Sequence, residues 1–457
     1  KRLPTPTDGC GTVRFVTVSN SEEYLGLARA DYQIDTEQTL FFRYYIAHLD
    51  QLSPYNNNDP LTITAPFVTY NMQFFALGHT FVINPTTINS FHASLNRGAI
   101  VRGSPPFFSA SDLGVNVTSL IPNFSMIVAS GAFTSGGGGT NDGHVYTTTP
   151  QITEDLNLVR GSHQIALGAN WIRPSENVLI DLYGMGSFSF SSQITGLSLA
   201  DFLTGNVGTF IQGNPAYNYH RTQYAGMYVQ DSWKVHPRLT VNYGLRWEPF
   251  FAVQVKDALV SHFDPGAFAA NQHSSVYPAA PAGVTYPGDP GFPNKAGYFG
   301  KAADFAPRAG MVWDPKGDGR LTIRSSYGIF YDRPQLLFGY QFGFEPPWGI
   351  QITLTNPAGG FADPWKGYAG GDPFQQLGKR AFFPPAAGFI NMPLHLNPPY
   401  LQQWNLSVQK QIERTGCSRR AISETRRRIS GQARKSIPAY TSPARRSATS
   451  SSGVFSH

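Results

Sequence analysis

The chain has 457 residues, of which 41% are hydrophobic and only 14% are charged, and its formal net charge is +6. The charged fraction is below the roughly 25% of soluble domains, yet no apolar run reaches the ~18 residues of a transmembrane helix. The two cysteines, Cys10 and Cys417, exclude a disulfide framework and show no metal-ligand spacing.

In chain order, apolar and polar residues alternate in paired segments of about ten residues. Such alternation predicts antiparallel strands joined by short turns that are rich in Pro, Gly, Asn and Asp. We count about eleven strands by this pattern, with one more possible at Gly186–Ser191. Predicted short turns lie at Asp35–Gln38, Asn84–Thr87, Arg160–His163 and Asp314–Gly319.

The clearest strand pair is YVQDSWKVHPRLTVNYGLRWEPF, residues 228–250. In its second arm one set of alternating residues is apolar and ends in Trp, and the other set is polar or charged. Successive residues of a strand point to opposite faces, so the two sets face different surroundings. The apolar set is Leu239, Val241, Tyr243, Leu245 and Trp247; the polar set includes Thr240, Asn242, Arg246 and Glu248.

Long connections alternate with these short turns. They are rich in Gly, Pro and Asn, and loops of such length are uncommon in compact soluble domains. Long strands, short turns on one side and long loops on the other predict an all-β, antiparallel, up-and-down transmembrane β-barrel in the outer membrane. The long connections, expected outside the cell, are 48–66, 98–150, 174–220, 250–305 and 333–400.

Two sets of residues are candidates for functional positions. The tryptophans near strand ends predict an interfacial aromatic girdle, with ligand stacking as the alternative. Residues on the polar faces predict a charged lumen lining, with a specific substrate site as the alternative. The girdle candidates are Trp171, Trp233, Trp247, Trp313 and Trp404; the lumen candidates are Asn242, Arg246, Glu248 and Arg324.

Catalytic motifs are not found. The sequence contains no HExxH, GxSxG, Walker A or CxxC pattern. The stretch DPKGDG at 314–319 is faintly similar to a calcium loop but lacks the downstream ligand, which favours a hairpin turn. We therefore predict a non-enzyme without cofactor or metal.

Several stretches resemble the barrel of Oar-like TonB-dependent receptors. The resemblance implies a barrel of about 22 strands with a plugged lumen, lipid and the TonB complex as partners, and uptake or surface binding of an extracellular ligand. It covers most of residues 20–412, so the chain is expected to form roughly half of such a barrel. The stretches are GSHQIALGANWI (161–172), LADFLTGN (199–206), YVQDSWKVHPRLTVNYGLRWEPF (228–250), APRAGMVWDPKGDGRLTIRSSYGIFYD (306–332) and PPYLQQWNLSVQKQI (398–412).

The two ends depart from this pattern. Residues 1–20 are expected to be an irregular lead-in after a missing plug, and 21–414 the partial barrel, because the chain begins at Lys1 without a signal peptide. Residues 417–457 contain nine basic residues and one acidic residue, Glu424, so their net charge is +8. The net charge of the rest of the chain is therefore −2. We interpret 415–457 as a frameshifted, disordered tail rather than a basic arm for nucleic acid or anionic lipid.

Two other classes of protein remain open on the sequence. A passive porin shares the barrel but has no plug. A soluble secreted all-β adhesin, carbohydrate-binding protein or carbohydrate-active enzyme also shows alternation and aromatic loops. If the chain is half of a larger barrel, its two open edges would prevent it from transporting anything by itself.

Overall fold

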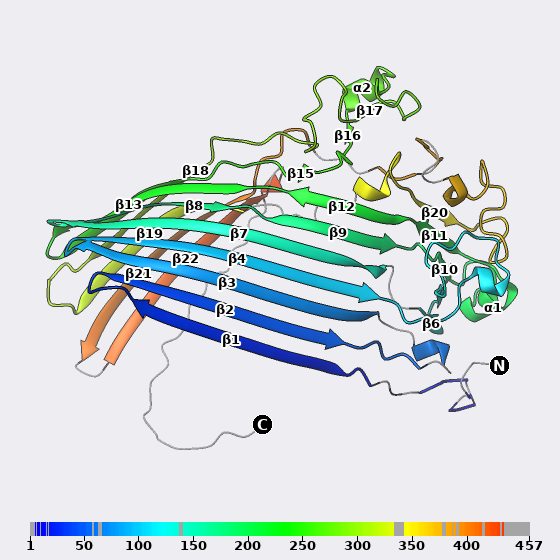
Figure 1. Ribbon diagram of the computed structural model, residues 1–457, viewed down its shortest axis with the longest axis horizontal. Coiled ribbons are helices and arrows are strands. Elements are labelled where there is room, and N and C mark those ends of the chain that lie inside the picture. Colours follow the sequence, from blue (N-terminus) through cyan, green and yellow to red (C-terminus); the bar gives the residue numbers. More distant parts are fainter. Residues whose placement is uncertain are drawn as a thin grey trace.

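The computed structural model describes residues 5, 7–9, 11–14, 16, 18–56, 59–62, 66–136, 140–332, 342–376, 381–385, 387–389, 393–413, 416–429 and 432–433. Its main feature is a single curled antiparallel sheet in which neighbouring strands follow chain order (Figure 1). Within the described residues no helix is long and apolar enough to cross a membrane.

The main sheet begins at β1 and continues strand by strand to the last described segment. Among the described residues up to Glu413 the wall has eleven long strands, which confirms the number expected from the alternation. They are β1 (Ser21–Gln33), β2 (Gln38–Gln51), β3 (Phe67–Asn84), β4 (Thr87–Gly103), β7 (Thr140–Arg160), β8 (His163–Ile172), β13 (Tyr224–His236), β14 (Leu239–Trp247), β18 (Phe305–Trp313), β19 (Leu321–Tyr331) and β21 (Tyr400–Glu413).

The short turns form where they were predicted, and their acceptor residues explain the local fold. Asp35 accepts hydrogen bonds from the backbone N–H groups of Glu37 and Gln38 at 2.8 and 2.7 Å. Asp314 accepts from three backbone N–H groups of its own turn, so its carboxylate stabilises the hairpin. The two-residue turn at 161–162 uses Gly161 at a φ of 58°.

Three strands are much longer than a membrane crossing requires. β3, β4 and β7 contain 18, 17 and 21 residues, whereas about 9–11 tilted residues span the hydrocarbon core. The expected long connection 98–150 is therefore wrong at both ends, because β4 runs to Gly103 and β7 starts at Thr140. These strands continue outward past the lipid and carry the loops away from it.

The connection expected at 174–220 also contributes to the wall. Its β9 (Ser175–Leu182) pairs with the outer half of β7, and β12 (Pro215–Arg221) pairs with β9 and β15 (Gln254–Val255). The segment Gly186–Ser191 is not an additional wall strand. Its β10 (Ser187–Phe190) belongs to a separate sheet in the outward loops.

The outward loops have a folded structure of their own. A five-stranded sheet, in the order β20-β11-β10-β5-β6, packs with α1, and a smaller lobe holds α2, β16 and β17 (Figure 1). The loop elements are β5 (Met126–Ala129), β6 (Phe133–Ser135), β10, α1 (Ser198–Thr204), β11 (Thr209–Gly213), β16 (His262–Phe263), α2 (Pro265–Ala269), β17 (Val284–Thr285) and β20 (Gln351–Thr355), with 3-10 turns at Pro60–Thr62, Ser111–Leu113 and Pro373–Gln376.

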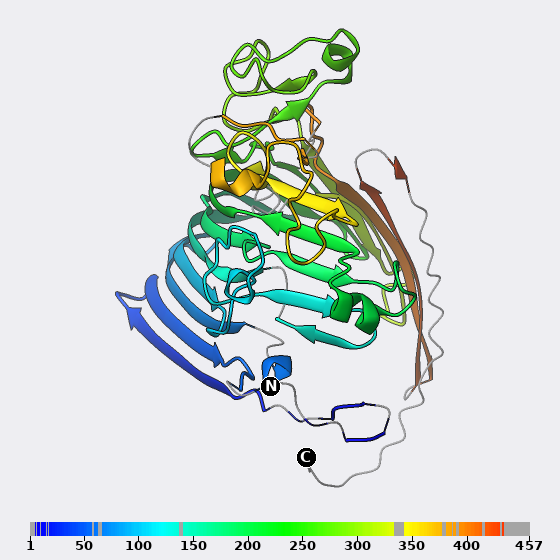
Figure 2. The ribbon, with the colours of Figure 1, turned by 90° about the vertical axis from the view of Figure 1, so that its right-hand side faces the viewer.

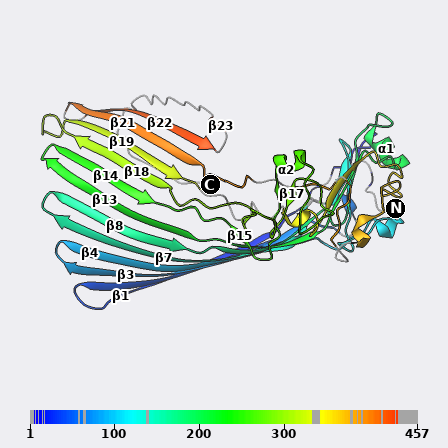
Figure 3. The same cartoon turned by 90° about the horizontal axis from the view of Figure 1, so that it is seen from above.

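The sheet does not close on itself in the part of the chain described. It curls with β1 at one edge and β22 (Gly416–Ile429) near the other, and the loops gather at one end (Figures 2 and 3). This open curl is the partial barrel that the sequence predicted.

The prediction of an irregular chain from residue 415 is wrong for residues 416–429. There β22 pairs antiparallel with β21 over thirteen residue pairs and is followed by β23 (Gln432–Ala433). The free edge of β21 offers a row of unpaired backbone groups, and a following segment can add to it whatever its composition. Residues 434–457 of the predicted tail lie outside the described residues.

The close packing of three strands at Gly168 gives a test of this register. A Cβ at Gly168 would lie 2.4 Å from Asp155 Oδ1 and 2.7 Å from Tyr228 Cε1. Gly168→Ala should therefore break the 2.6 Å hydrogen bond from Tyr228 to Asp155 and cost about 1–3 kcal/mol in a urea titration of the folded chain. Gly26→Ala is the control, because its Cβ would meet only Ile46 Cγ2 at 3.1 Å; equal losses for the two variants would contradict the register.

Candidate functional site: two faces of the wall and the outward loops

The strand register divides the predicted site residues between the two faces of the sheet. Trp233 lies opposite Val241 and Trp247 opposite Met227, on the face that also carries Leu245. Asn242 and Arg246 alternate with them and point to the other face. The same register places Trp171, Trp313 and Trp404 with the first set, and Arg324 with the second.

The polar face is the concave one. A hollow of about 900 Å³ follows it over β13, β14, β18, β19 and β21. The opposite, convex face leaves apolar side chains open, with Met227 and Val229 54% and 52% exposed. A sheet with a polar hollow on one side and uncovered apolar residues on the other fits a wall between water and lipid.

The five tryptophans form two groups along the strands. Trp233 and Trp313 lie within three residues of the strand ends at the short turns. Trp171 and Trp247 lie eight residues from the first residue of their strands, and Trp404 nine from the last residue of its strand. At about 3.3 Å per residue and a tilt near 40°, the second group lies about 20–23 Å from the short-turn ends of its strands along the membrane normal.

On the concave face Arg246 is the centre of a hydrogen-bond network. Its guanidinium donates to Glu248 at 2.7 Å, to Asn170 at 2.7 Å and to the Tyr224 hydroxyl at 2.6 Å. The Tyr224 hydroxyl also contacts Glu248. Register therefore brings Arg246 and Glu248 together on one face, and the pair is neutral as a unit.

Two other arginines line the hollow without such neutralisation. Arg308 lies over the Phe330 ring, with 4.7 Å from its guanidinium carbon to the ring centroid. Neither Arg308 nor Arg324 forms an ion pair with a carboxylate in the described part of the chain. The hollow is therefore positive on the β18–β19 side, next to amides that include Gln403 and Asn405.

Three of the outward connections share one core, which the sequence did not predict. Residues from three different connections pack together there, and the buried Gln212 joins them: its amide donates to the Thr118 carbonyl at 2.5 Å and accepts from Trp365 at 3.3 Å. Asn214 accepts from the Ile350 backbone N–H at 2.6 Å. The apolar members of this core include Phe188, Phe190, Phe210, Ile352 and Trp365.

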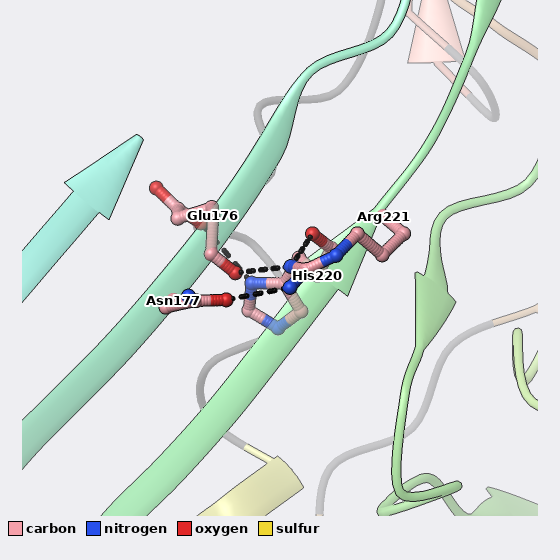
Figure 4. Close-up of polar contacts among 4 residues, drawn as sticks. All are labelled: Glu176, Asn177, His220 and Arg221. Atoms are coloured by element: carbon pink, nitrogen blue, oxygen red, sulfur yellow. Dashed lines mark hydrogen bonds and ion pairs between the residues drawn. The ribbon is translucent and has the colours of Figure 1, made fainter. Parts of the chain in front are cut away.

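A buried polar cluster ties β9 to β12 where these strands leave the membrane. His220, fully buried, lies with Nδ1 3.1 Å from Glu176 Oε2. Arg221 donates to Asn177 Oδ1 at 2.7 Å and to the Glu176 carbonyl at 3.0 Å (Figure 4). Buried polar groups must find partners, and this cluster stabilises the outward extension of the wall.

An aromatic hollow of about 570 Å³ opens in the β14–β18 connection. Its cation, Lys301, lies 3.0 Å from Asp304 Oδ1, so the lining is nearly neutral. Among the described residues no group of three or more His, Cys, Asp or Glu is placed to hold a metal ion. The aromatic lining consists of Phe250, Phe251, Phe292, Tyr298 and Phe299.

One ionisable group in the loop layer has a strongly shifted pKa. Asp181 lies beyond the roughly ten residues of β8 that cross the membrane, and only 4% of it is exposed. Burial raises the pKa of its carboxyl to about 7, helped by the charge of Asp142, while the Gly184 N–H acts in the opposite direction. No sequence pattern indicated this residue, because its burial comes from distant loops.

Register also shows a polar group on the convex face that the alternation pattern missed. Asp231 points to the same side as Trp233 and is 8% exposed. His163 Nδ1 and the Tyr243 hydroxyl lie 2.6 and 2.8 Å from its Oδ2. A carboxylate on an otherwise apolar face was visible in the sequence as the one acidic break in the apolar set of residues 227–235.

These observations define a class: an antiparallel β wall with one face for lipid, one polar face, short turns and long folded loops is an outer-membrane β-barrel. A family model described as outer membrane beta barrel domain matches residues 1–418. The chain belongs to this family and is located in the outer membrane. No curated protein sequence matches it.

Solved structures similar to the chain are outer-membrane transporters and receptors. The transporter YddB from Escherichia coli is 10% identical with a TM-score of 0.47, over 92% of this chain and 41% of that one. The ferric-catecholate import receptor Fiu from E. coli K12 gives 12% and 0.45, over 90% and 52%. The alcaligin receptor FauA from Bordetella pertussis gives 10% and 0.43, over 89% and 44%. The chain thus spans about half the length of these proteins.

The shifted pKa of Asp181 makes the loop layer sensitive to pH. The folded chain holds this proton more tightly than the unfolded chain, whose value is 3.8. The free energy of unfolding of the layer should therefore fall as pH rises from about 4 to about 7 and stay low above it, by about 2–4 kcal/mol. Asp181→Asn should remove this slope, measured as amide hydrogen exchange of the loop layer corrected for intrinsic rates.

Asp112→Asn serves as the matched control. Hydrogen bonds from Ser109 lower the pKa of Asp112, so its removal should cost protection near neutral pH instead of adding it. A wild-type layer whose protection does not change between pH 4 and pH 8 would contradict the assignment.

Proposed function

We propose that this chain is part of the wall of an Oar-like TonB-dependent receptor that binds a large nutrient at its outward loops. The observation that carries the proposal is the polar, positively charged concave face beneath a folded loop layer. The family membership supports the barrel, and the sequence resemblance supports the receptor subtype. The role needs no catalytic group.

Further strands should complete the barrel. In the described part of the chain β1 pairs only with β2, so its outer edge presents unpaired N–H and C=O groups. Each such group costs several kcal/mol in hydrocarbon. The receptor proposal satisfies this edge with the rest of a barrel of about 22 strands, the number that the resemblance implies.

The concave hollow should hold a plug. Arg308 and Arg324 line it without carboxylate partners among the described residues, and such cations in a confined space favour an acidic or phosphate-like neighbour. A plug that carries the TonB-contacting segment would supply that neighbour. Movement of the plug under TonB would then open the path along the concave face.

Ligand recognition should lie in the loops. They combine a shared core with an aromatic hollow in the β14–β18 connection that carries almost no net charge. Aromatic faces bind sugar rings and apolar side chains, which fits a glycan, a peptide or a chelate with an apolar surface. Rigid loops on a scaffold are where binding usually resides.

The convex face should meet lipid, with the five tryptophans as girdles at the two interfaces. The second group lies about 20–23 Å from the short-turn ends of the strands, close to the ~25 Å apolar band of outer-membrane barrels. The concave Asn242, Arg246, Glu248 and Arg324 should face the lumen. Both sets are assigned from the same strand register, so an error in the register would make both assignments wrong.

Cysteine labelling tests the two faces. Leu245→Cys should react with a lipid-phase maleimide, and Asn242→Cys, three positions away on the concave side, only with a water-soluble reagent. Leu245→Arg should cost about 2–4 kcal/mol of stability in bilayers, because it places a charge in hydrocarbon. The assignment is falsified if position 242 labels from lipid and position 245 does not.

Bilayer recordings separate the receptor from a passive porin. In the described part of the chain the outer edge of β1 has no partner strand, so reconstituted protein should give no steady single-channel conductance. Stable ohmic pores from the purified chain would mean that it closes a barrel by itself, and would favour the porin. Co-reconstitution with acidic peptides that mimic a plug should protect the concave face from water-soluble labels.

A further inference from the structure

Three side chains form a row across the convex face, at the end of the strands where the short turns lie. Arg160, the last residue of β7, lies directly opposite His163, the first residue of β8. His163 in turn lies directly opposite Trp233 on β13. Directly opposed residues have Cβ atoms about 5 Å apart, so the row presents a guanidinium, an imidazole and an indole side by side.

Contacts on both sides fix the middle of this row. The His163 ring stacks on Trp233 with centroids 5.2 Å apart and planes at 13°. Its Nδ1 lies 2.6 Å from Asp231 Oδ2, which also accepts from Tyr243. The carboxylate sits one row further into the membrane and is 8% exposed, so it sets the plane of the imidazole and leaves Nε2 directed away from it.

The guanidinium of Arg160 keeps free donors. Its Nη1 donates to the Thr86 hydroxyl at 3.2 Å, which draws the side chain along the wall. Arg160 forms no ion pair with a carboxylate among the residues that the structure describes. A guanidinium has five N–H donors in a planar fork that matches a phosphate, so most of its donors remain for a ligand.

The row is still open to its surroundings. The His163 and Trp233 side chains are 37% and 38% exposed, and Arg160 is exposed. It lies at the level of the short-turn tryptophans, where lipid headgroups meet the periplasmic side of the membrane. An exposed cation beside an indole at this depth meets a phosphate before any other anion.

We propose that Arg160, His163 and Trp233 form a binding site for the phosphate headgroup of a phospholipid in the periplasmic leaflet. Arg160 binds the phosphate oxygens through its fork, Nε2 of His163 provides a second contact, and the Trp233 indole packs on the glycerol backbone. Asp231 acts as a positioning residue through His163. The site would hold this part of the wall at a fixed depth in the bilayer.

The inference rests on the lipid-facing orientation of the convex face in the proposed function. It adds the ligand chemistry: a phosphate carried by a lipid rather than a free phosphate ion. The two ligands can be distinguished by competition. If the site binds free phosphate, inorganic phosphate in solution should displace the lipid probe. If it binds a lipid phosphate, the lipid has the advantage of its high concentration at the membrane surface.

Photocrosslinking in membranes tests the site on the full chain. The probe is phosphatidylethanolamine with a diazirine in its headgroup, and crosslinks on β8 and β13 are mapped by mass spectrometry. Arg160→Gln should reduce crosslinking about tenfold, as expected for loss of a charge-assisted hydrogen bond. Arg160→Lys, which keeps the charge, should restore part of it, and His163→Gln should give an intermediate loss.

Lys234→Gln is the matched control. Lys234 is exposed, loses the same charge and lies one residue from Trp233, but points to the concave face. Its crosslinking should equal that of the unsubstituted chain, and a diacylglycerol probe without phosphate should be insensitive to Arg160→Gln. Equal effects of the two substitutions, or complete competition by inorganic phosphate, would overturn the lipid site.

A second probe separates this inference from the orientation of the wall. Phosphatidylethanolamine with a diazirine in the acyl chain should label the β8 surface around Leu167, whichever residue occupies position 160. If the acyl probe labels β8 and the headgroup probe does not, the headgroup site is wrong and the orientation stands. If neither labels β8, the orientation fails and the site with it.

Discussion

Backbone N–H and C=O groups find no water in the hydrocarbon core of a membrane, so each must be paired inside the protein. For a wall of strands this requires an unbroken ladder, and the order from β1 to β21 supplies it by pairing each long strand with its neighbours in the chain. Antiparallel neighbours can be joined by turns of a few residues, as they are at one end of the wall. Connections at the other end carry no such demand, and their entropy cost grows slowly with length.

The same ladder places every second side chain in a different solvent. On the concave face Arg246 and Glu248 neutralise each other in a hydrogen-bond network beside the hollow. On the apolar part of the convex face, away from the short turns, the carboxylate of Asp231 is held by partners, His163 and Tyr243. Gly168 on β8 lies between Asp155 on β7 and Tyr228 on β13. Because it has no side chain, the Tyr228 hydroxyl can reach Asp155.

The sequence predicts this structure well only where one face of a strand meets lipid and the other meets water. Within the membrane the alternation is imposed residue by residue, so the eleven strands, the short turns and the shared face of Arg246 and Glu248 follow from the pattern. Beyond the membrane both faces of a strand are covered by protein, and alternation fades. In β9, for example, Glu176, Val178 and Asp181 are all buried. Because alternation is lost there, the sequence predicted loops where the outer halves of the strands lie.

Pairing between distant segments is the other part that local pattern cannot give. β11 pairs with β20, which lies in a different connection, and β10 pairs in parallel with β5. The Asp231 cluster joins β8, β13 and β14, so it is visible only when the register of three strands is known. β22 joins the sheet because the edge of β21 pairs with backbone groups, whatever the side chains of the added segment are. A pattern of side chains could therefore not predict this strand.

The shared core of the loops has a consequence for how a ligand meets the protein. Gln212 and Asn214 tie the β8–β13 connection to the loops before and after it by hydrogen bonds within the packed interior. Breaking these bonds would leave buried polar groups unsatisfied, at about 1–3 kcal/mol each. These three connections are therefore coupled through one packed interior, and a ligand that contacts one of them would also act on the other two.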